Sequence, residues 1–133
     1  MKILVDTNVL ISAIVFAGRP RRLLLNLISS GHKLIVTDYV LKEFSDVVEK
    51  KWPDKAKVII EIFKGMDFVF SESTTEETDI LIRDKKDIQV LSDAIYHEVD
   101  VVLSGDRDFL ESEIEKPVIM SVAMLDEFLE NRI

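Results

Sequence analysis

Residues 3–9 read ILVDTNV, a short β-branched run that ends in an acid and leads directly into a helical pattern. Such a run, bounded by polar residues, is typical of a buried strand. Similar runs return along the chain and predict five buried strands: 3–5, 34–36, 68–70, 101–103 and 118–120. Stretches with helical spacing lie between and after them: 9–16, 21–28, 40–49, 58–63, 88–99 and 122–129. Strands alternating with helices predict an α/β fold, a three-layer sandwich with a central, mostly parallel five-stranded sheet flanked by helices.

The composition limits the class of protein. The 133 residues are 47% hydrophobic and 32% charged, so we expect one folded domain over 1–133. Seventeen basic and twenty-five acidic residues give a formal charge of −8, which argues against coating of nucleic acid through phosphate neutralisation. The chain has no cysteine, which excludes disulfides and sulfur-ligated metals. No stretch resembles a signal peptide or a membrane span, so we expect a cytoplasmic protein without membrane contact.

Two acids stand near the ends of the first two predicted strands, the edge where open α/β sheets bind ligands. Asp6 ends the first strand, and either Asn8 or Asp6 itself can cap the next helix. Asn8 is the better candidate, which leaves Asp6 without a structural role. Glu43 borders the apolar stripe of a helix for which Asp38 is the expected N-cap. A carboxylate in that position needs a partner, which is either a salt bridge or a metal ion.

Later acids follow the same pattern. Asp87 points toward the buried face of the helix over 88–99, where it is either a charge favoured by the helix dipole or a ligand. That face includes Ile95, whereas Asp93 projects away from it and is expected to be a solvated surface acid. After the fourth strand, Asp106 has no evident structural role. The next acid, Asp108, forms a capping-box spacing with Glu111.

Four acids are thus expected at or near one edge of the sheet, where they would repel one another unless a cation lies among them. They are Asp6, Glu43, Asp87 and Asp106. Hard oxygen ligands suit Mg²⁺ or Mn²⁺, which are completed by waters and substrate phosphates. Zinc is disfavoured because the two histidines, His32 and His97, are far apart in the sequence.

Taken in order, these motifs resemble the PIN-domain nucleases, particularly the compact prokaryotic proteins related to toxins of toxin–antitoxin systems, often called VapC-like. The resemblance spans essentially the full chain, and its strongest parts are the N-terminal Val-Asp-Thr-Asn and residues 104–109, SGDRDF. It implies a PIN-like fold related to RNase H-like and flap nucleases. It also implies a homodimer or higher homo-oligomer, and a small antitoxin as a possible partner.

The resemblance also implies roles for particular residues. It assigns Asp6, Glu43, Asp87 and Asp106 as catalytic ligands of Mg²⁺ or Mn²⁺, with Asp108 assisting a second ion, and Asn8 and Ser104 orienting the acids or the metal-bound water. The family often has Asp-Pro-x-Asp before the fifth helix. Here Lys85 replaces the proline, and Asp84 is a further candidate alongside Asp87.

The implied activity is that of a metal-dependent endoribonuclease, which hydrolyses RNA phosphodiesters with an activated water and needs no protein nucleophile. Two bound divalent ions would change the formal charge from −8 to −4, so the argument from charge excludes only non-specific coating. Arg107, between two acids, is the best candidate for a phosphate contact. The cluster Arg19, Arg21 and Arg22 either binds phosphates or partner acids, or is a solvated helix end.

Two alternatives stay open. A receiver-like phosphoacceptor domain is also a small acidic α/β protein, and Lys116-Pro117 near the last strand favours it. Receivers, however, carry an acidic pair after the first strand, and here Asp6 is followed by Thr7-Asn8. The other alternative is a catalytically silent PIN fold that serves as a binding module.

Overall fold

The computed structural model describes residues 1–75, 85–112 and 114–131. The elements in chain order are β1 (Lys2–Val5), α1 (Thr7–Ile11), the π-helix η1 (Ser12–Phe16), α2 (Gly18–Ser29), β2 (Lys33–Thr37), α3 (Asp38–Lys51), the 3₁₀ turn η2 (Pro53–Lys55), α4 (Ala56–Lys64), β3 (Val69–Ser71), α5 (Lys85–Tyr96), β4 (Val101–Leu103), α6 (Arg107–Leu110), β5 (Val118–Met120) and α7 (Val122–Glu130). The predicted alternation of strands and helices is confirmed.

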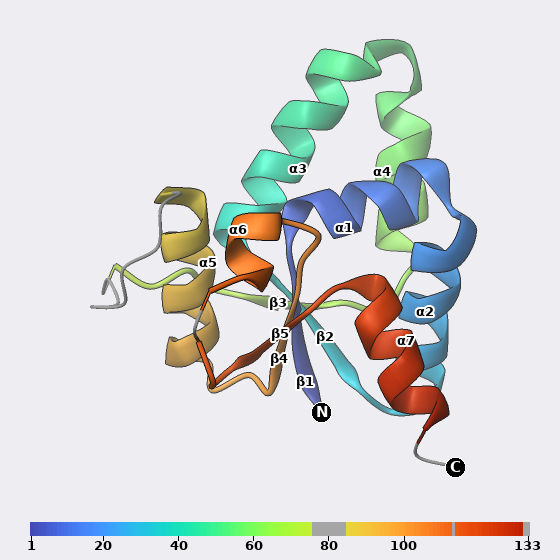
Figure 1. Ribbon diagram of the computed structural model, residues 1–133. Coiled ribbons are helices and arrows are strands. Elements are labelled where there is room, and N and C mark those ends of the chain that lie inside the picture. Colours follow the sequence, from blue (N-terminus) through green and yellow to red (C-terminus); the bar gives the residue numbers. More distant parts are fainter. Residues whose placement is uncertain (76–84, 113, 132–133) are drawn as a thin grey trace.

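The sheet is parallel throughout, with the strand order β3-β2-β1-β4-β5. Its central strand is β1, where Ile3 lies opposite Leu34 of β2 on one side and Val101 of β4 on the other. From β1 the chain first builds outward through β2 and β3, and later returns to add β4 and β5 (Figure 1). The order therefore reverses between β1 and β4, and ligands of such sheets bind beyond the carboxyl ends of the strands at this reversal.

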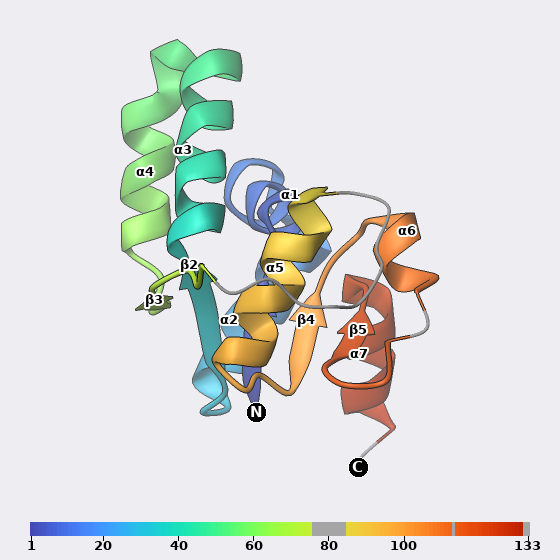
Figure 2. The ribbon, with the colours of Figure 1, turned by 90° about the vertical axis from the view of Figure 1, so that its left-hand side faces the viewer.

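Helices cover both faces of the sheet. One face lies under α5, and α2 and α7 cover the other (Figures 1 and 2). The central strand is buried after its exposed first residue, Lys2, since Ile3, Leu4 and Val5 have no exposed surface. The edge strand β3 differs from the prediction of a buried strand, because Val69 and Phe70 are exposed there. No helix in the described ranges is long and apolar enough to cross a membrane.

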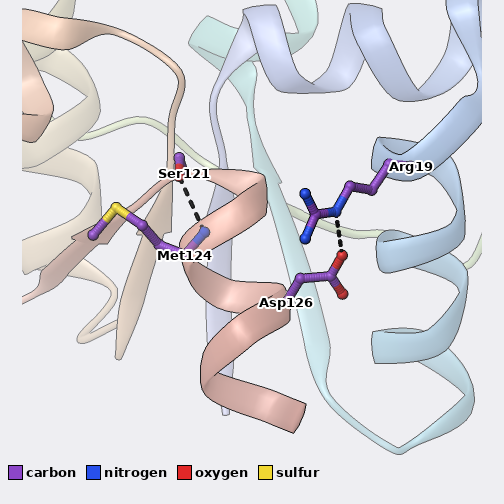
Figure 3. A network of polar contacts seen from close by, with 4 residues as sticks. All are labelled: Arg19, Ser121, Met124 and Asp126. Atoms are coloured by element: carbon purple, nitrogen blue, oxygen red, sulfur yellow. Dashed lines mark hydrogen bonds and ion pairs between the residues drawn. The ribbon is translucent and has the colours of Figure 1, made fainter. Parts of the chain in front are cut away.

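Two polar contacts help to hold α7: one joins it to α2, and the other caps its first turn. Figure 3 shows Arg19 at the start of α2 reaching Asp126 of α7, with 2.6 Å between Nε and Oδ2. Ser121 begins α7 as its N-cap, since its hydroxyl accepts a hydrogen bond from the Met124 amide at 3.2 Å. Arg19 therefore has a partner within the chain, and this contact favours a structural role for it.

Candidate active site

Asp6 lies where β1 passes into α1. Its amide still donates to the Leu103 carbonyl of β4 at 3.0 Å, and its own Oδ1 accepts from the Thr7 amide at 2.7 Å. Asp6 is therefore the N-cap of α1, and the prediction that Asn8 caps this helix is wrong because the helix starts two residues earlier. The side chain of Asp6 is buried at this position, with 9% of the residue exposed.

Ser104 connects Asp6 to the segment after β4. Its hydroxyl donates to Asp6 Oδ2 at 2.9 Å and accepts from the Asp106 amide at 3.1 Å, and the residue is fully buried. The two Asp6 oxygens thus each receive one hydrogen bond, from Ser104 and from Thr7. These donors fix the orientation of the carboxylate and leave further lone pairs for a cation.

Asp106 caps the short helix α6. Its Oδ1 accepts from the Phe109 amide at 3.3 Å, and its carbonyl accepts from the Leu110 amide at 2.9 Å. The expectation that Asp106 has no structural role is therefore wrong, as is the capping box assigned to Asp108 and Glu111. Glu111 instead lies 3.7 Å from Arg107 Nε, one helical turn away.

Glu43 lies on α3 beside its buried stripe. Thr37, not Asp38 as predicted, caps this helix, with the Thr37 hydroxyl accepting from the Val40 amide at 3.4 Å. The Glu43 side chain is 23% exposed, and its Oε2 lies 3.4 Å from the ammonium of Lys86 at the start of α5. The salt-bridge alternative for Glu43 is therefore present in the structure.

Two of the other predicted acids act on the carboxyl group of Asp6. The pKa of Asp6 is raised, first because burial disfavours its charged form and further because Glu43 and Asp106 are negative. The hydrogen bonds from Ser104 and Thr7 oppose this rise but do not cancel it. The structure thus brings Glu43 and Asp106 within electrostatic reach of Asp6, in an arrangement that favours a cation.

Asp87 lies in the first turn of α5 and is 3% exposed, so its predicted inward orientation is confirmed. Its neighbour Lys86 links this turn to Glu43. Two expectations for α5 are wrong. Asp93 is completely buried and not solvated, whereas Ile95, assigned to the buried face, is 44% exposed.

Among the other predicted site residues, Asn8 and Arg107 are exposed. Asn8 is exposed and lines a surface hollow together with Gly105 and Ser121. The side chain of Arg107 is 87% exposed. The backbone of Asp108 lies in α6, and its role as a ligand stays a prediction. Asp84 lies outside the described residues.

The remaining arginine and tryptophan contacts are structural. Arg21 donates to the carbonyls of Ala13 and Ile14 at 2.8 and 2.6 Å, which ties the start of α2 to η1. Trp52, at the corner between α3 and α4, packs edge-on against Phe16 with 5.8 Å between ring centroids. These contacts favour a structural role for Arg21 and Trp52.

The donor chemistry of the site fits a hard divalent ion. The acids and Ser104 offer oxygen atoms alone. Burial and, after it, the charges of Glu43 and Asp106 raise the pKa of Asp6, and a cation would offset those charges. In the described part of the chain, no three acidic or histidine side chains form a ready-made metal-binding group. Mg²⁺ is nevertheless commonly held by one or two carboxylates, with waters and substrate phosphates completing its shell.

Sequence reasoning did not identify Lys86. A signal was present, because lysines at 85 and 86 precede Asp87 at the start of a helix, where the dipole disfavours cations. An unfavourable charge in that place indicates a specific partner, which the structure identifies as Glu43.

Comparison with known proteins agrees with this architecture. The fold is similar to that of VapBC2 from Rickettsia felis, crystallised with a DNA fragment from its promoter, with a TM-score of 0.72 and 16% identity over 91% of this chain and 98% of that one. It is also similar to VapC20 from Mycobacterium tuberculosis, a toxin that cleaves the sarcin–ricin loop, with a TM-score of 0.58 and 13% identity over 80% of this chain and 92% of that one.

No sequence among the curated proteins matches the chain. A family model for the PIN domain, however, matches residues 2–108, a range that includes Asp6, Glu43, Asp87, Ser104 and Asp106. This range covers most of the 133 residues, and the chain therefore belongs to the PIN domain family.

Proposed function

We propose that the protein is a metal-dependent endoribonuclease that acts at the carboxyl edge of β1 and β4. The observation that carries this proposal is the buried carboxylate of Asp6, whose pKa is raised by burial and by the charges of Glu43 and Asp106. Acids crowded in this way lower stability and are concentrated at functional sites. Membership of the PIN domain family supports a nuclease over the receiver-like phosphoacceptor domain.

The residues that would hold Mg²⁺ or Mn²⁺ are Asp6, Glu43, Asp87 and Asp106, with Asp108 as a ligand of a second ion. A bound divalent ion supplies a water of lowered pKa, polarises a phosphoryl oxygen and stabilises the leaving oxygen. The chain contributes the orientation of the ligands. Ser104 and the Thr7 amide fix the two oxygens of Asp6, and the cap of α6 fixes Asp106.

Supporting roles follow from position. Asn8 is exposed beside the end of β1, where it can contact an RNA strand or the water shell of an ion. Arg107 is paired with Glu111 at 3.7 Å on the surface. Such pairs are weak, and an RNA phosphate can replace the carboxylate. Both roles belong to the proposal.

We extend the proposal to the biological role. The likeness to VapBC2 and VapC20 supports the toxin component of a toxin–antitoxin system, a single PIN domain over 1–133 that forms a homodimer or higher homo-oligomer and is held by a small antitoxin. In that case expression of the chain without a partner should arrest bacterial growth, and Asp6→Asn should relieve the arrest. Growth arrest that persists in Asp6→Asn contradicts the toxin role.

The test of the nuclease is RNA cleavage by purified protein with Mg²⁺ or Mn²⁺, and with the ions removed by chelation. Asp6→Ala and Asp106→Ala should each lower the cleavage rate more than about 100-fold, because even outer-shell partners of metal ligands cost about 10- to 100-fold. Ser104→Ala, which removes such an outer partner of Asp6, should cost about 10-fold.

Glu49→Ala is the matched control, because Glu49 is an exposed acid on α3 and its loss should leave cleavage unchanged. Undiminished cleavage in both Asp6→Ala and Asp106→Ala would overturn the proposed site. Wild-type protein that binds RNA but cleaves none with either ion would instead be a PIN-fold binding module.

A further inference from the structure

Lys86 is a basic side chain placed among the candidate acids. It occupies the first turn of α5, which packs alongside α3 (Figure 2), and its Nζ lies 3.4 Å from Oε2 of Glu43. The Lys86 side chain is 62% exposed, while that of Glu43 is 23% exposed. The ammonium thus reaches from solvent to the carboxylate at the rim of the site.

Local helix chemistry does not explain this lysine. The positive end of the helix dipole lies at the N-terminus, so a cation in the first turn is disfavoured, whereas Asp87 in the same turn is favoured. The contact with Glu43 gives Lys86 a reason to be there. The other basic side chains with described ion pairs face acids outside the site: Arg19 pairs with Asp126, and Arg107 with Glu111.

The ion pair affects the whole group of acids. After burial, the charges of Glu43 and Asp106 raise the pKa of Asp6, so both of these acids repel the Asp6 carboxylate. The positive charge of Lys86 beside Glu43 offsets part of this repulsion. A divalent ion would offset the same repulsion, and it would compete with the ammonium for the Glu43 carboxylate, whose Oε2 now faces Lys86.

We propose that Lys86 is a tethered counter-ion of the site: it holds Glu43 while no divalent ion is bound, and a binding ion must displace it. This inference rests on the proposed function, because it takes Glu43 as a ligand. Lysine suits the role, since its compact ammonium sits on a flexible stem and its exposure lets it move back into water. Lys86 therefore lowers the affinity of the site for divalent ions.

The test is a titration of the protein with Mn²⁺, in which electron paramagnetic resonance measures the free ion. Lys86→Met should bind Mn²⁺ about two- to fivefold more tightly than wild type, the effect expected from removing one exposed ion pair. Lys86→Arg should stay near wild type because it keeps the charge and the pairing. Lys42→Met removes an exposed lysine next to Glu43 on α3 and is the control for net charge.

A higher Mn²⁺ affinity in Lys86→Met than in Lys42→Met supports the counter-ion role. When each substitution is made separately in a Glu43→Gln protein, this difference in affinity should vanish. Unchanged or weaker binding in Lys86→Met overturns the role, and weaker binding would mean that Lys86 only positions Glu43.

Asp6→Asn in the same titration separates the two proposals. If Asp6→Asn binds Mn²⁺ as wild type does, the proposed site fails and the counter-ion role fails with it. If Asp6→Asn loses binding and Lys86→Met is unchanged, only the counter-ion role fails.

Discussion

Asp93 and Asp6 are two of the buried aspartates among the described residues, and their surroundings differ. Asp93 on α5 has no exposed surface and accepts three hydrogen bonds, from the Ser73 hydroxyl at 2.8 Å, the Thr74 amide at 2.7 Å and Gln89 Nε2 at 3.0 Å. These donors belong to α5 itself and to the segment that follows β3. Asp93 thus joins two parts of the chain, and neutral donors compensate its charge.

Asp6 is almost as deeply buried, but it accepts one hydrogen bond on each oxygen and lies near two further acids, Glu43 and Asp106. Burial and, after it, these two negative charges raise the pKa of Asp6, while the two hydrogen bonds oppose the rise. The comparison indicates that burial alone does not distinguish a structural acid from a functional one. The distinguishing feature is whether the surroundings satisfy the charge, as around Asp93, or add to it, as around Asp6.

The largest effect on stability should come from the structural acid. Asp93→Ala leaves the Ser73, Thr74 and Gln89 donors without their acceptor inside the protein, and should lower the free energy of unfolding by about 3 kcal/mol. Denaturant unfolding at neutral pH measures this loss.

Asp93→Asn provides the matched control for that change. Its amide oxygen can still accept from Thr74 and Gln89, and the Ser73 hydroxyl can rotate to accept from the new amide group. We expect Asp93→Asn to retain most of the stability. An Asp93→Ala protein as stable as wild type would contradict the structural role of Asp93.

A smaller effect of opposite sign is expected at Asp6, the proposed metal ligand. Asp6→Asn removes a buried charge that Glu43 and Asp106 repel, while an amide can keep the hydrogen bonds with Thr7 and Ser104. The free energy of unfolding of the metal-free protein should therefore rise by about 0.5–2 kcal/mol at pH 7, as is common when a strained functional site is relieved.

The gain in Asp6→Asn should depend on pH. The pKa of Asp6 is higher in the folded than in the unfolded protein, so the folded state binds more protons between the two values, and wild-type stability falls as the pH rises through that window. Below the ordinary Asp value of 3.8 both states are protonated and the difference should disappear. Unfolding of both proteins at several pH values measures this difference in stability. If the gain of Asp6→Asn persists at about pH 3, its cause is packing and not charge.

Much of the fold could be predicted from the sequence, because short β-branched runs such as 34–36 and 101–103 mark parallel strands strongly. The ends of the predicted strands also place Asp6 and Asp106 at one edge of the sheet. The pairing order and the exposure of β3 could not be predicted in this way, because they depend on which strand each segment meets in space.

The environment of single acids was harder to predict. A helical wheel shows which face of α5 meets the sheet, but not that Ser73 and Thr74 cover the opposite side, and this is why the wheel wrongly predicts a solvated Asp93. Likewise α6 is a single turn without periodicity, so its cap was assigned to Asp108 instead of Asp106. Such contacts between distant segments decide which acids are satisfied.

One measurement tests the central claim most directly: the melting temperature with and without Mn²⁺ for wild type, Asp6→Asn and Asp93→Asn. An ion that binds the folded state alone raises the melting temperature of any variant that retains its site. We predict a rise for wild type and for Asp93→Asn, and none for Asp6→Asn, although the metal-free form of Asp6→Asn is the most stable of the three. A rise in Asp6→Asn equal to that of wild type would contradict the assignment of Asp6 to a metal site.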